Sequence, residues 1–318
     1  MKAIIFNKYG PPEVLVMAEV EKPVPKDHEV LIKVKATAVN SADCRIRRAD
    51  PFLVRLVFGL FRPRKKILGL VLAGEIEDVG KKVSRYKTGD KIFGATELQF
   101  GANAEYACMK ETDALALKPD TITFEEAASI PFGAHTALNF LQKAKIQPGQ
   151  KVMIYGASGA VGTAAVQLAK HFGAHVTGVC STTNLKLVKS LGADRVIDYT
   201  KEDVSRLPET WDVIFETVDK ISTFQLARIV KKGGTLILGS AMLKGMLQGA
   251  WISMSGKAKV LMGSHKTTAS DMIIFLDLLA SGAIKPLIDR VYPLEEIVEA
   301  HRYVDAGHKK GNVVIKIN

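Results

Sequence analysis

The stretch that decides the fold is Val152-Met153-Ile154-Tyr155-Gly156-Ala157-Ser158-Gly159-Ala160-Val161-Gly162. An apolar run with strand composition leads into small residues, and a helical pattern follows. Gly159 lets the backbone approach a pyrophosphate, Gly162 lets the helix pack on the strand, and the helix N-terminus favours an anion. The alternative is a glycine-rich turn without a ligand. We predict a dinucleotide site whose cofactor contacts are Ser158, Gly159, Ala160, Val161 and Gly162.

The sequence around this stretch alternates between strand and helix patterns. Predicted strands cover residues 151–155, 175–180, 195–198, 211–217, 235–239 and 259–262. Predicted helices cover residues 159–172, 184–191, 201–207 and 222–231. Parallel strands joined by right-handed helical crossovers form a doubly wound α/β sheet with helices on both faces. We therefore expect a dinucleotide-binding domain over residues 124–265.

The remainder of the chain is predicted to form a β-rich domain. Strand patterns cover residues 2–6, 30–39, 70–79 and 91–93, separated by Gly-Lys-Lys and Thr-Gly-Asp turns. After the α/β region come an amphipathic helix over 270–281, a strand-like segment over 284–292, a helix over 294–305 and a strand over 312–317. We interpret this tail as returning to the first domain, which then comprises residues 1–123 and 266–318.

The composition is that of an ordinary globular protein with about two domains. The 318 residues are 47% hydrophobic and 24% charged, which is enough apolar material for sizeable cores. The formal net charge of +11 is compatible with nucleic acid, a membrane surface or an anionic cofactor as a partner. Because the basic residues are spread along the chain, we interpret them as a solvated surface that attracts an anionic cofactor, and we expect no specific nucleic-acid site.

Several features favour a cytoplasmic location. The three cysteines, Cys44, Cys108 and Cys180, are too sparse and too widely spaced for a disulfide framework or a metal cluster. Residues 1–6 are too short and too strand-like for a signal peptide. The uncharged run 152–169 has the length of a membrane span, but its glycines and polar residues indicate a strand, a turn and a helix instead.

The end of the second predicted strand bears on the choice of cofactor. NAD sites usually carry an Asp or Glu there, whereas this chain has Cys180 and no carboxylate to repel a 2′-phosphate. Hydroxyls, an amide, an amine and a new helix N-terminus follow instead. The alternative is that these polar residues only cap the helix. We predict NADPH over NADH, bound by Cys180, Ser181, Thr182, Asn184 and Lys186.

Motifs along the whole chain resemble those of the medium-chain dehydrogenase/reductase superfamily, and within it the zinc-independent quinone oxidoreductases. The resemblance implies a GroES-like catalytic domain beside a six-stranded Rossmann sheet. The matching motifs are Asn40-Ser41-Ala42-Asp43, Gly69-Leu70-Val71-Leu72-Ala73-Gly74-Glu75, Ala127-Ala128-Ser129-Ile130-Pro131 with Thr136-Ala137, and Leu191-Gly192-Ala193-Asp194.

The resemblance also implies that no metal takes part. Zinc-dependent relatives carry a Cys where this chain has Asn40, and a His and a Glu where it has Leu70 and Val71. Leucine and valine cannot ligate zinc. Without a Lewis acid to stabilise an alkoxide, the expected chemistry is hydride transfer to a conjugated acceptor, a quinone or an α,β-unsaturated carbonyl. A zinc alcohol dehydrogenase remains the less favoured alternative.

Further site residues are implied by the resemblance alone. Asn40 and Asp43 would line the nicotinamide end and serve as the catalytic pair. Asn184 departs from the family, which often has a Lys at that position. No general acid is assigned, although His135 and His265 are candidates. The remaining implied cofactor contacts are Thr136, Tyr199, Gly239, Ser240 and Asn312. The alternative role of Thr136 and Tyr199 is packing, at a helix start and a strand end.

Two apolar segments predict the character of the substrate and partners. Residues 51–61, followed by basic residues 62–66, and residues 241–262, rich in Met and Leu, suggest a pocket for a small hydrophobic electrophile. The first segment also allows at most weak peripheral contact with membranes. A homodimer paired around residues 259–262 is implied by the resemblance. The alternative to an enzyme is a non-catalytic NADPH-binding protein of structural or RNA-contacting type.

Overall fold

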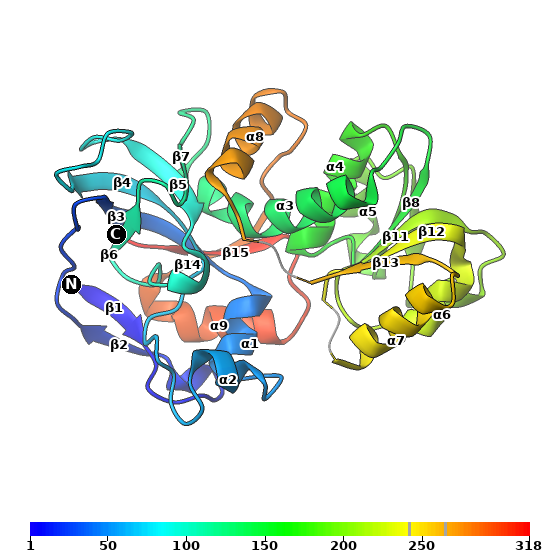
Figure 1. Ribbon diagram of the computed structural model, residues 1–318, viewed down its shortest axis with the longest axis horizontal. Coiled ribbons are helices and arrows are strands. Elements are labelled where there is room, and N and C mark those ends of the chain that lie inside the picture. Colours follow the sequence, from blue (N-terminus) through cyan, green and yellow to red (C-terminus); the bar gives the residue numbers. More distant parts are fainter. Residues whose placement is uncertain (241–242, 264–265) are drawn as a thin grey trace. The chain divides into compact units, whose positions relative to one another are not determined.

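The computed structural model describes residues 1–240, 243–263 and 266–318 (Figure 1). The chain divides into two compact units. Unit 1 comprises Met1–Phe132, Lys266–Ala280 and Pro286–Asn318, and unit 2 comprises Gly133–His265 and Ser281–Lys285. Among the described residues, no helix is both long and apolar enough to span a bilayer.

Unit 2 contains a six-stranded parallel sheet whose strand order is β10-β9-β8-β11-β12-β13. The chain starts in the middle of the sheet, adds strands on one side and then crosses to the other. Ligands of such sheets bind at the carboxyl ends of the strands where the order reverses, which here is the end of β8. The predicted doubly wound fold is confirmed. The strands are β8 (Lys151–Tyr155), β9 (His175–Cys180), β10 (Arg195–Asp198), β11 (Trp211–Glu216), β12 (Val230–Leu238) and β13 (Lys259–Met262).

Helices cover both faces of this sheet. Figure 1 shows α4 (Ala160–His171) and α5 (Leu185–Ser190) on one side, and α6 (Thr223–Ile229) and α7 (Leu243–Met254) on the other. α7 was predicted only as an apolar segment. The helix predicted over residues 201–207 is wrong, since the structure has a single 3-10 turn, η4 (Val204–Arg206).

The long helix α3 (Phe124–Ala144) was not predicted, and the boundary between the two units falls inside it. Gly133 permits a close approach there. A Cβ on Gly133 would lie 2.6 Å from the carbonyl oxygen of Ala160, so α3 passes directly beside the first residue of α4. This contact fixes α3 against the glycine-rich turn.

Unit 1 is built on a seven-stranded mixed sheet and a separate hairpin. The sheet order is β14-β15-β3-β4-β5-β7, with β6 also paired to β3. β15 runs antiparallel to β3, with Val314 opposite Ala38, so the C-terminal segment completes a sheet begun near the N-terminus. The strands are β1 (Lys2–Ile5), β2 (Val16–Glu19), β3 (Glu29–Val39), β4 (Val71–Val79), β5 (Lys91–Ala95), β6 (Tyr106–Lys110), β7 (Ala114–Leu117), β14 (Ile288–Pro293) and β15 (Asn312–Lys316).

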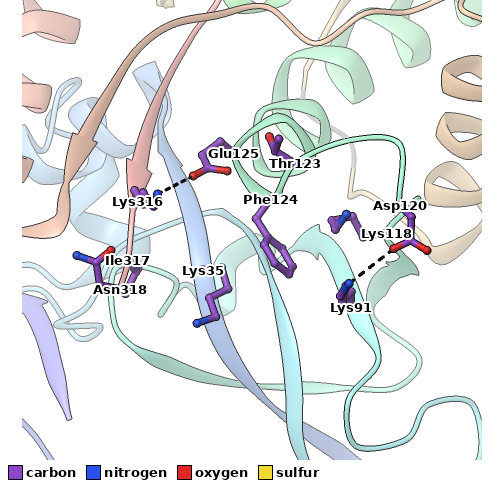
Figure 2. A pocket seen from close by; sticks show the side chains of 10 residues that line it. All are labelled: Lys35, Lys91, Lys118, Asp120, Thr123, Phe124, Glu125, Lys316, Ile317 and Asn318. Atoms are coloured by element: carbon purple, nitrogen blue, oxygen red, sulfur yellow. Dashed lines mark ion pairs between the residues drawn. The ribbon is translucent and has the colours of Figure 1, made fainter.

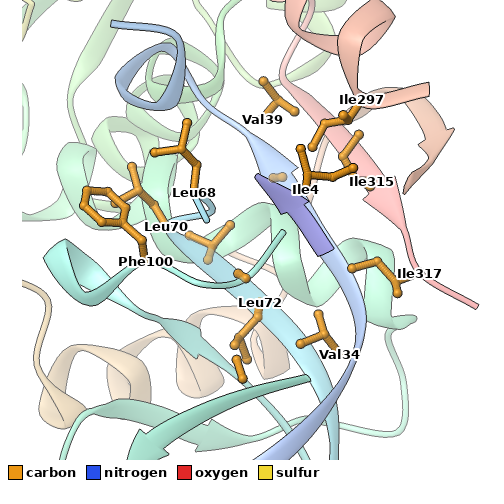
Figure 3. Packing of buried hydrophobic residues seen from close by; sticks show 14 of the residues in the cluster. Ile4, Val34, Val39, Leu68, Leu70, Leu72, Phe100, Ile297, Ile315 and Ile317 are labelled. Carbon is orange, nitrogen blue, oxygen red and sulfur yellow. The ribbon is translucent and has the colours of Figure 1, made fainter. Parts of the chain in front are cut away.

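The core of unit 1 joins the hairpin, the sheet and α9. Figure 3 shows apolar side chains from β1, β3, β15 and the segment around β4 packed together, with Phe100 and Ile297 among them. Burial of such side chains supplies the main stabilisation of the unit. The helices and 3-10 turns of unit 1 are η1 (Pro12–Val14), α1 (Ser41–Arg48), α2 (Val54–Phe58), η2 (Glu97–Gln99), α8 (Ala269–Ala280), η5 (Leu294–Glu296) and α9 (Ile297–Asp305).

Candidate functional site

The glycine-rich turn after β8 has the geometry that a pyrophosphate requires. Gly156 adopts φ +84°, a left-handed conformation, and turns the chain out of the strand. A Cβ on Gly162 would lie 2.1 Å from the Gly156 carbonyl oxygen, so the helix sits directly on the turn. By contrast, a Cβ on Gly159 would meet nothing closer than that same oxygen at 3.7 Å. Gly159 therefore leaves open space for a ligand.

The first turn of α4 is suited to an anion. Gly159 is its N-cap, with extended backbone at φ −80° and ψ 176°. The first N–H groups of an α-helix have no partner within the helix, and the helix dipole adds positive potential. No acidic residue lies in this first turn. The turn that includes Ser158, Ala160 and Val161 thus fits the phosphates of a dinucleotide.

Asn184 links the glycine-rich turn to the loop after β9. It ends the 3-10 turn η3 (Thr182–Asn184) and precedes α5. Its side-chain Nδ2 donates to Ser158 Oγ at 3.1 Å and to Ser181 Oγ at 3.2 Å. Its Oδ1 is buried without a hydrogen-bond partner among the described residues. The structure therefore brings three predicted cofactor residues together, with Asn184 holding the other two.

The other members of the predicted 2′-phosphate loop differ in how accessible they are. Cys180 is buried, and this burial raises the pKa of its thiol to about 11. Its backbone carbonyl accepts from the Tyr199 N–H at 3.1 Å. With the residue 1% exposed, its side chain has no part at the surface. Lys186 is exposed in the first turn of α5.

A carboxylate that the sequence reasoning missed borders this loop. Asp198 ends β10 and lies opposite Cys180 in the parallel register. It accepts a hydrogen bond from Thr182 Oγ1 at 2.5 Å and from Thr200 Oγ1 at 2.7 Å. These two hydroxyls lower the pKa of the Asp198 carboxyl. The expectation that no carboxylate lies near the loop is wrong, because Asp198 arrives from the neighbouring strand.

A surface cavity of about 390 Å³ opens beside Tyr199. Tyr199 is 48% exposed, and its ring centroid lies 6.4 Å from that of the buried Tyr155. Thr200 and Lys220 also line the cavity, so the end of β8 and the segments that follow β10 and β11 meet here. A half-exposed aromatic ring beside a cavity can stack on a flat heterocycle.

The ends of β11 and β12 are tied together at the predicted carboxamide position. The Gly239 N–H donates to the Glu216 carbonyl at 2.8 Å, and Ser240 Oγ donates to the Thr217 carbonyl at 2.7 Å. Thr136 is half-buried in α3, with His135 buried beside it in the sequence. The other proton-donor candidate, His265, lies outside the described residues.

In unit 1, the predicted catalytic pair forms the start of α1. Asn40 is the N-cap, and the Asp43 carboxylate accepts its backbone N–H at 3.0 Å in a capping box. Asp43 also accepts the N–H of Gly69 at 3.2 Å. Both residues are 1% exposed. Burial raises the pKa of Asp43 to about 7. Asp43 is therefore a positioning residue for the segment that carries Asn40.

Asn40 keeps an unused donor. Its side-chain Nδ2 is buried without a hydrogen-bond partner in residues 1–240, 243–263 and 266–318. An orphaned amide donor at a predicted ligand position is the sort of group that a substrate or cofactor oxygen satisfies. Asn312 resembles it only in part, because its Nδ2 donates to the Leu287 carbonyl at 3.1 Å and so secures the start of β15.

Two of the three positions at which the resemblance places zinc ligands in metal-dependent relatives are apolar here. Leu70 and Val71 are buried, and Figure 3 shows Leu70 packed against Phe100. Within the described ranges no group of three or more His, Cys, Asp and Glu side chains has the proximity to hold a metal ion.

Cys44 has a partner that the sequence did not reveal. Its Sγ lies 3.3 Å from Nδ1 of His301, a fully buried residue of α9. Burial lowers the pKa of His301 to about 3 and raises that of the Cys44 thiol well above its usual value. The pair is therefore neutral and belongs to the core, where α9 packs against α1.

A second surface cavity, of about 430 Å³, lies in unit 1 and contains none of the predicted site residues (Figure 2). Four lysines line it, but two of them face carboxylates, Lys91 facing Asp120 and Lys316 facing Glu125, each at 3.7 Å. Lys118 Nζ donates to two backbone carbonyls. Three of the four lysines of this cavity are thus engaged within the protein.

Known proteins resemble this chain over its whole length. Two family models match: a zinc-binding dehydrogenase model over residues 191–315 and an alcohol dehydrogenase GroES-like domain model over residues 26–120. The chain is 35% identical to 2-methylene-furan-3-one reductase of Solanum lycopersicum, over 99% of this chain and 79% of that protein. It is 32% identical to the chloroplastic NADPH-dependent alkenal/one oxidoreductase of Arabidopsis thaliana, over 99% and 79%.

A solved structure gives the same picture. The quinone oxidoreductase from Coxiella burnetii superposes with a TM-score of 0.90 at 28% identity, covering 100% of this chain and 99% of that one. Fold and site together define a two-unit oxidoreductase with a dinucleotide-binding sheet. The chain belongs to the medium-chain dehydrogenase/reductase superfamily, in its quinone oxidoreductase-like family.

Proposed function

We propose that this protein reduces quinones or α,β-unsaturated carbonyls with NADPH, without zinc. The observation that carries the proposal is the open space at Gly159 in the glycine-rich turn, which we call the cradle. Next to it, Asn184 donates a hydrogen bond to Ser158. The names of the relatives, a 2-methylene-furan-3-one reductase, an alkenal/one oxidoreductase and a quinone oxidoreductase, support an electrophilic conjugated acceptor.

In this proposal unit 2 binds the cofactor. The turn formed by Ser158, Gly159, Ala160, Val161 and Gly162 would hold the pyrophosphate at the N-terminus of α4. Tyr199, beside its cavity, would take the adenosine end. Thr136, Gly239 and Ser240 would border the carboxamide. Fixed groups of this sort contribute to catalysis mainly by holding the reactants in register.

The preference for NADPH would rest on the loop after β9. Ser181, Thr183 and Lys186 offer hydroxyls and an amine to a 2′-phosphate. Asp198 would oppose it, although its charge is partly satisfied by Thr182. We propose that the donors outweigh the carboxylate. The name of the Arabidopsis relative, which is NADPH-dependent, supports this preference.

On the substrate side, the residues of unit 1 would bind and orient the acceptor. NADPH, when bound, supplies a hydride to an electron-poor carbon of the acceptor. The Asn40 amide would then donate a hydrogen bond to the oxygen on which negative charge develops. Asp43 would keep Asn40 in place through the capping box. The proton that completes the reduction would come from water.

Zinc independence is proposed because two of the positions that carry zinc ligands in metal-dependent relatives pack into the core here. Leu70 and Val71 contribute to the apolar core of unit 1, and a metal there would meet neither nitrogen, oxygen nor sulfur from these two side chains. Activity should therefore be unchanged after dialysis against a strong chelator. A loss of activity that added zinc restores would exclude this part of the proposal.

The substrate class is tested by NADPH oxidation with quinones, alkenals, enones and aldehydes in parallel. We expect turnover with the conjugated acceptors and little with saturated aldehydes. We expect kcat/KM to favour NADPH over NADH by at least roughly tenfold, about 1.4 kcal/mol. Equal use of both cofactors would contradict the assignment of the β9–α5 loop, and no turnover with any acceptor would favour a non-catalytic role.

We propose a cytoplasmic homodimer formed through unit 2. Within the described part of the chain β13 pairs only with β12 and is an edge strand, and edge strands are protected from uncontrolled pairing by covering or charge. The adjacent helix α7 exposes an apolar face with Leu243, Leu247 and Trp251. Sedimentation equilibrium of a Leu247→Glu, Trp251→Glu variant would test this. A wild-type monomer at micromolar concentration would exclude the dimer.

A further inference from the structure

One surface of unit 1 combines exposed apolar side chains with unpaired positive charge. We call it the 52–66 surface. Its six outward-facing apolar residues are between 45% and 86% exposed: Phe52, Leu53, Leu56, Val57, Leu60 and Phe61. Contiguous apolar patches of this kind on a globular protein mark interaction sites. The residues come from a single continuous segment around α2, all within one unit.

The inner side of this segment is fixed to the unit. Val54 and Phe58 pack against the core, and the Phe58 ring meets the Phe100 ring edge-on at 5.6 Å between centroids. Tyr9 Oη donates to the Gly59 carbonyl at 2.8 Å, and the Arg64 N–H donates to the Phe58 carbonyl at 2.8 Å. The outer side chains are thus presented on a built support, not on a loose loop.

The charged residues next to these apolar residues are all positive. Residues 51–74 contain no Asp or Glu. Four basic side chains follow the apolar run and are exposed, namely Arg62, Arg64, Lys65 and Lys66. Among the residues that the structure describes, none of the four takes part in an ion pair. The nearest acid along the chain, Asp50, faces Arg48 at 3.9 Å.

We propose that the 52–66 surface docks the protein on an anionic lipid membrane. Apolar side chains can enter the boundary between headgroups and acyl chains while lysines and arginines remain at the anionic headgroups. A second copy fits this surface less well, because a two-fold contact would bring like charges face to face. A nucleic acid would satisfy the charge but not the exposed Phe61 and Leu56.

This partner would also bring the protein to its substrates under the proposed function. Hydrophobic quinones and long-chain enals partition into lipid, so docking raises their local concentration. Vesicle binding does not need turnover, so a failure of the docking proposal and a failure of the proposed function can be told apart.

The test is co-sedimentation of the full-length protein with vesicles at 50 and 500 mM salt. One set is phosphatidylcholine alone and the other contains 30% phosphatidylserine. We expect binding to the anionic vesicles at low salt, weakened at high salt because the contact is partly electrostatic. Binding to neither set at 50 mM salt overturns the proposal.

Two variants separate the two components. The triple change Arg64→Ser, Lys65→Ser, Lys66→Ser should lower the partition coefficient roughly a hundredfold, since each charge contributes about a factor of five. The double change Leu56→Ser, Phe61→Ser should also weaken vesicle binding. The binding that remains should then be abolished completely by high salt. Both sets of residues are exposed, so thermal unfolding should stay at the wild-type temperature.

Matched controls make these outcomes decisive. Lys81→Ser, Lys87→Ser, Lys232→Ser removes the same charge from exposed positions elsewhere, and Val24→Ser, Ile273→Ser removes exposed apolar side chains elsewhere. Controls that weaken vesicle binding as much as the 52–66 variants would overturn the proposal. So would a Leu56→Ser, Phe61→Ser variant that dissociates a dimer in sedimentation while its vesicle binding is unchanged, because a second copy would then cover this surface.

Discussion

The side chain of Asn184 donates a hydrogen bond to the hydroxyl of Ser158 over 3.1 Å, and so joins the loop after the second strand of the sheet to the glycine-rich turn after the first. The same Nδ2 reaches Ser181 at 3.2 Å. In the proposed site, one side chain sets the spacing between the pyrophosphate cradle and the 2′-phosphate loop.

Replacing Asn184 by Ala should weaken NADPH binding and leave the chemistry alone. Two hydrogen bonds of about 1 kcal/mol each are lost, and part of this is regained when the serines meet water. We expect the KM for NADPH to rise about tenfold with kcat unchanged within about twofold, measured by steady-state kinetics. Ser190→Ala, at an exposed hydroxyl at the end of α5, should behave as wild type. An equal loss in kcat would show that Asn184 acts on the reaction itself.

Gly159 and Gly162 should respond differently to the same added methyl group. Gly162→Ala places a Cβ 2.1 Å from a backbone oxygen and should lower the unfolding temperature markedly. Gly159→Ala meets nothing within 3.4 Å, so the fold should tolerate it while the methyl group occupies ligand space. We expect wild-type thermal stability and at least roughly tenfold weaker NADPH binding by calorimetry, about 1.4 kcal/mol. If Gly159→Ala binds NADPH normally, the cradle assignment is wrong.

Asp43 should make the protein less stable as the pH rises through the mildly acidic range. Its pKa is raised from 3.8 in the unfolded chain to about 7 in the fold, so the native state holds the extra proton between these values. The free energy of unfolding should therefore fall between about pH 4 and 7, by on the order of 4 kcal/mol from this group. In urea unfolding, the difference in the free energy of unfolding between wild type and Asp43→Asn should change over this same pH range.

Asp198 supplies the opposite sign as a control. Its pKa is lowered by the Thr182 and Thr200 hydroxyls, so its contribution is present above the unfolded pKa and is lost as the pH falls. The free energy of unfolding of wild type should increase relative to that of Asp198→Asn as the pH rises from about 3 to 5. A difference curve for Asp43→Asn with this same sign would show that its carboxyl is ionised in the fold.

His301 should limit stability in acid. Its pKa falls from 6.5 in the unfolded chain to about 3 in the buried pair with Cys44, so the unfolded state binds the proton first. Stability from this group is complete above about pH 6.5 and is lost as the pH falls toward 3, by on the order of 5 kcal/mol. The His301→Gln variant should be less stable than wild type at neutral pH. Its free energy of unfolding should fall less than that of wild type between pH 6.5 and 4. If the free energy of unfolding of the two proteins fell equally over that pH range, a neutral buried imidazole would be refuted.

Much of unit 2 was readable from the sequence because buried parallel strands appear as short apolar runs. The predicted bounds of β8, β9, β10 and β13 match the observed strands residue for residue. The helix α3 was missed because it contains Pro131 and Gly133, which local rules treat as helix breakers. Its packing against α4 overrides that preference. Around residues 201–207, Asp203 bonds to Ser205 and competes with helix formation.

The candidate site was readable only where its residues are contiguous. The glycine-rich turn is one stretch of chain, and its spacing indicates its geometry. The Asp198–Thr182 contact depends on the register between two strands, and the Cys44–His301 pair joins residues 257 positions apart. No pattern in the sequence encodes such distances. The segment 52–66 was recognised as apolar and then basic, but which of its side chains face outward required the fold.

The three cysteines have a consequence for the chemical durability of the protein. Conjugated carbonyls and quinones alkylate thiolates, so an enzyme that handles them risks being inactivated by its own substrates. Burial raises the pKa of Cys108 and Cys180 to about 11 and that of Cys44 well above its usual value. All three thiols are thereby kept protonated and weakly nucleophilic at neutral pH. The fold therefore makes the protein's own thiols poor targets for the electrophiles it is proposed to reduce.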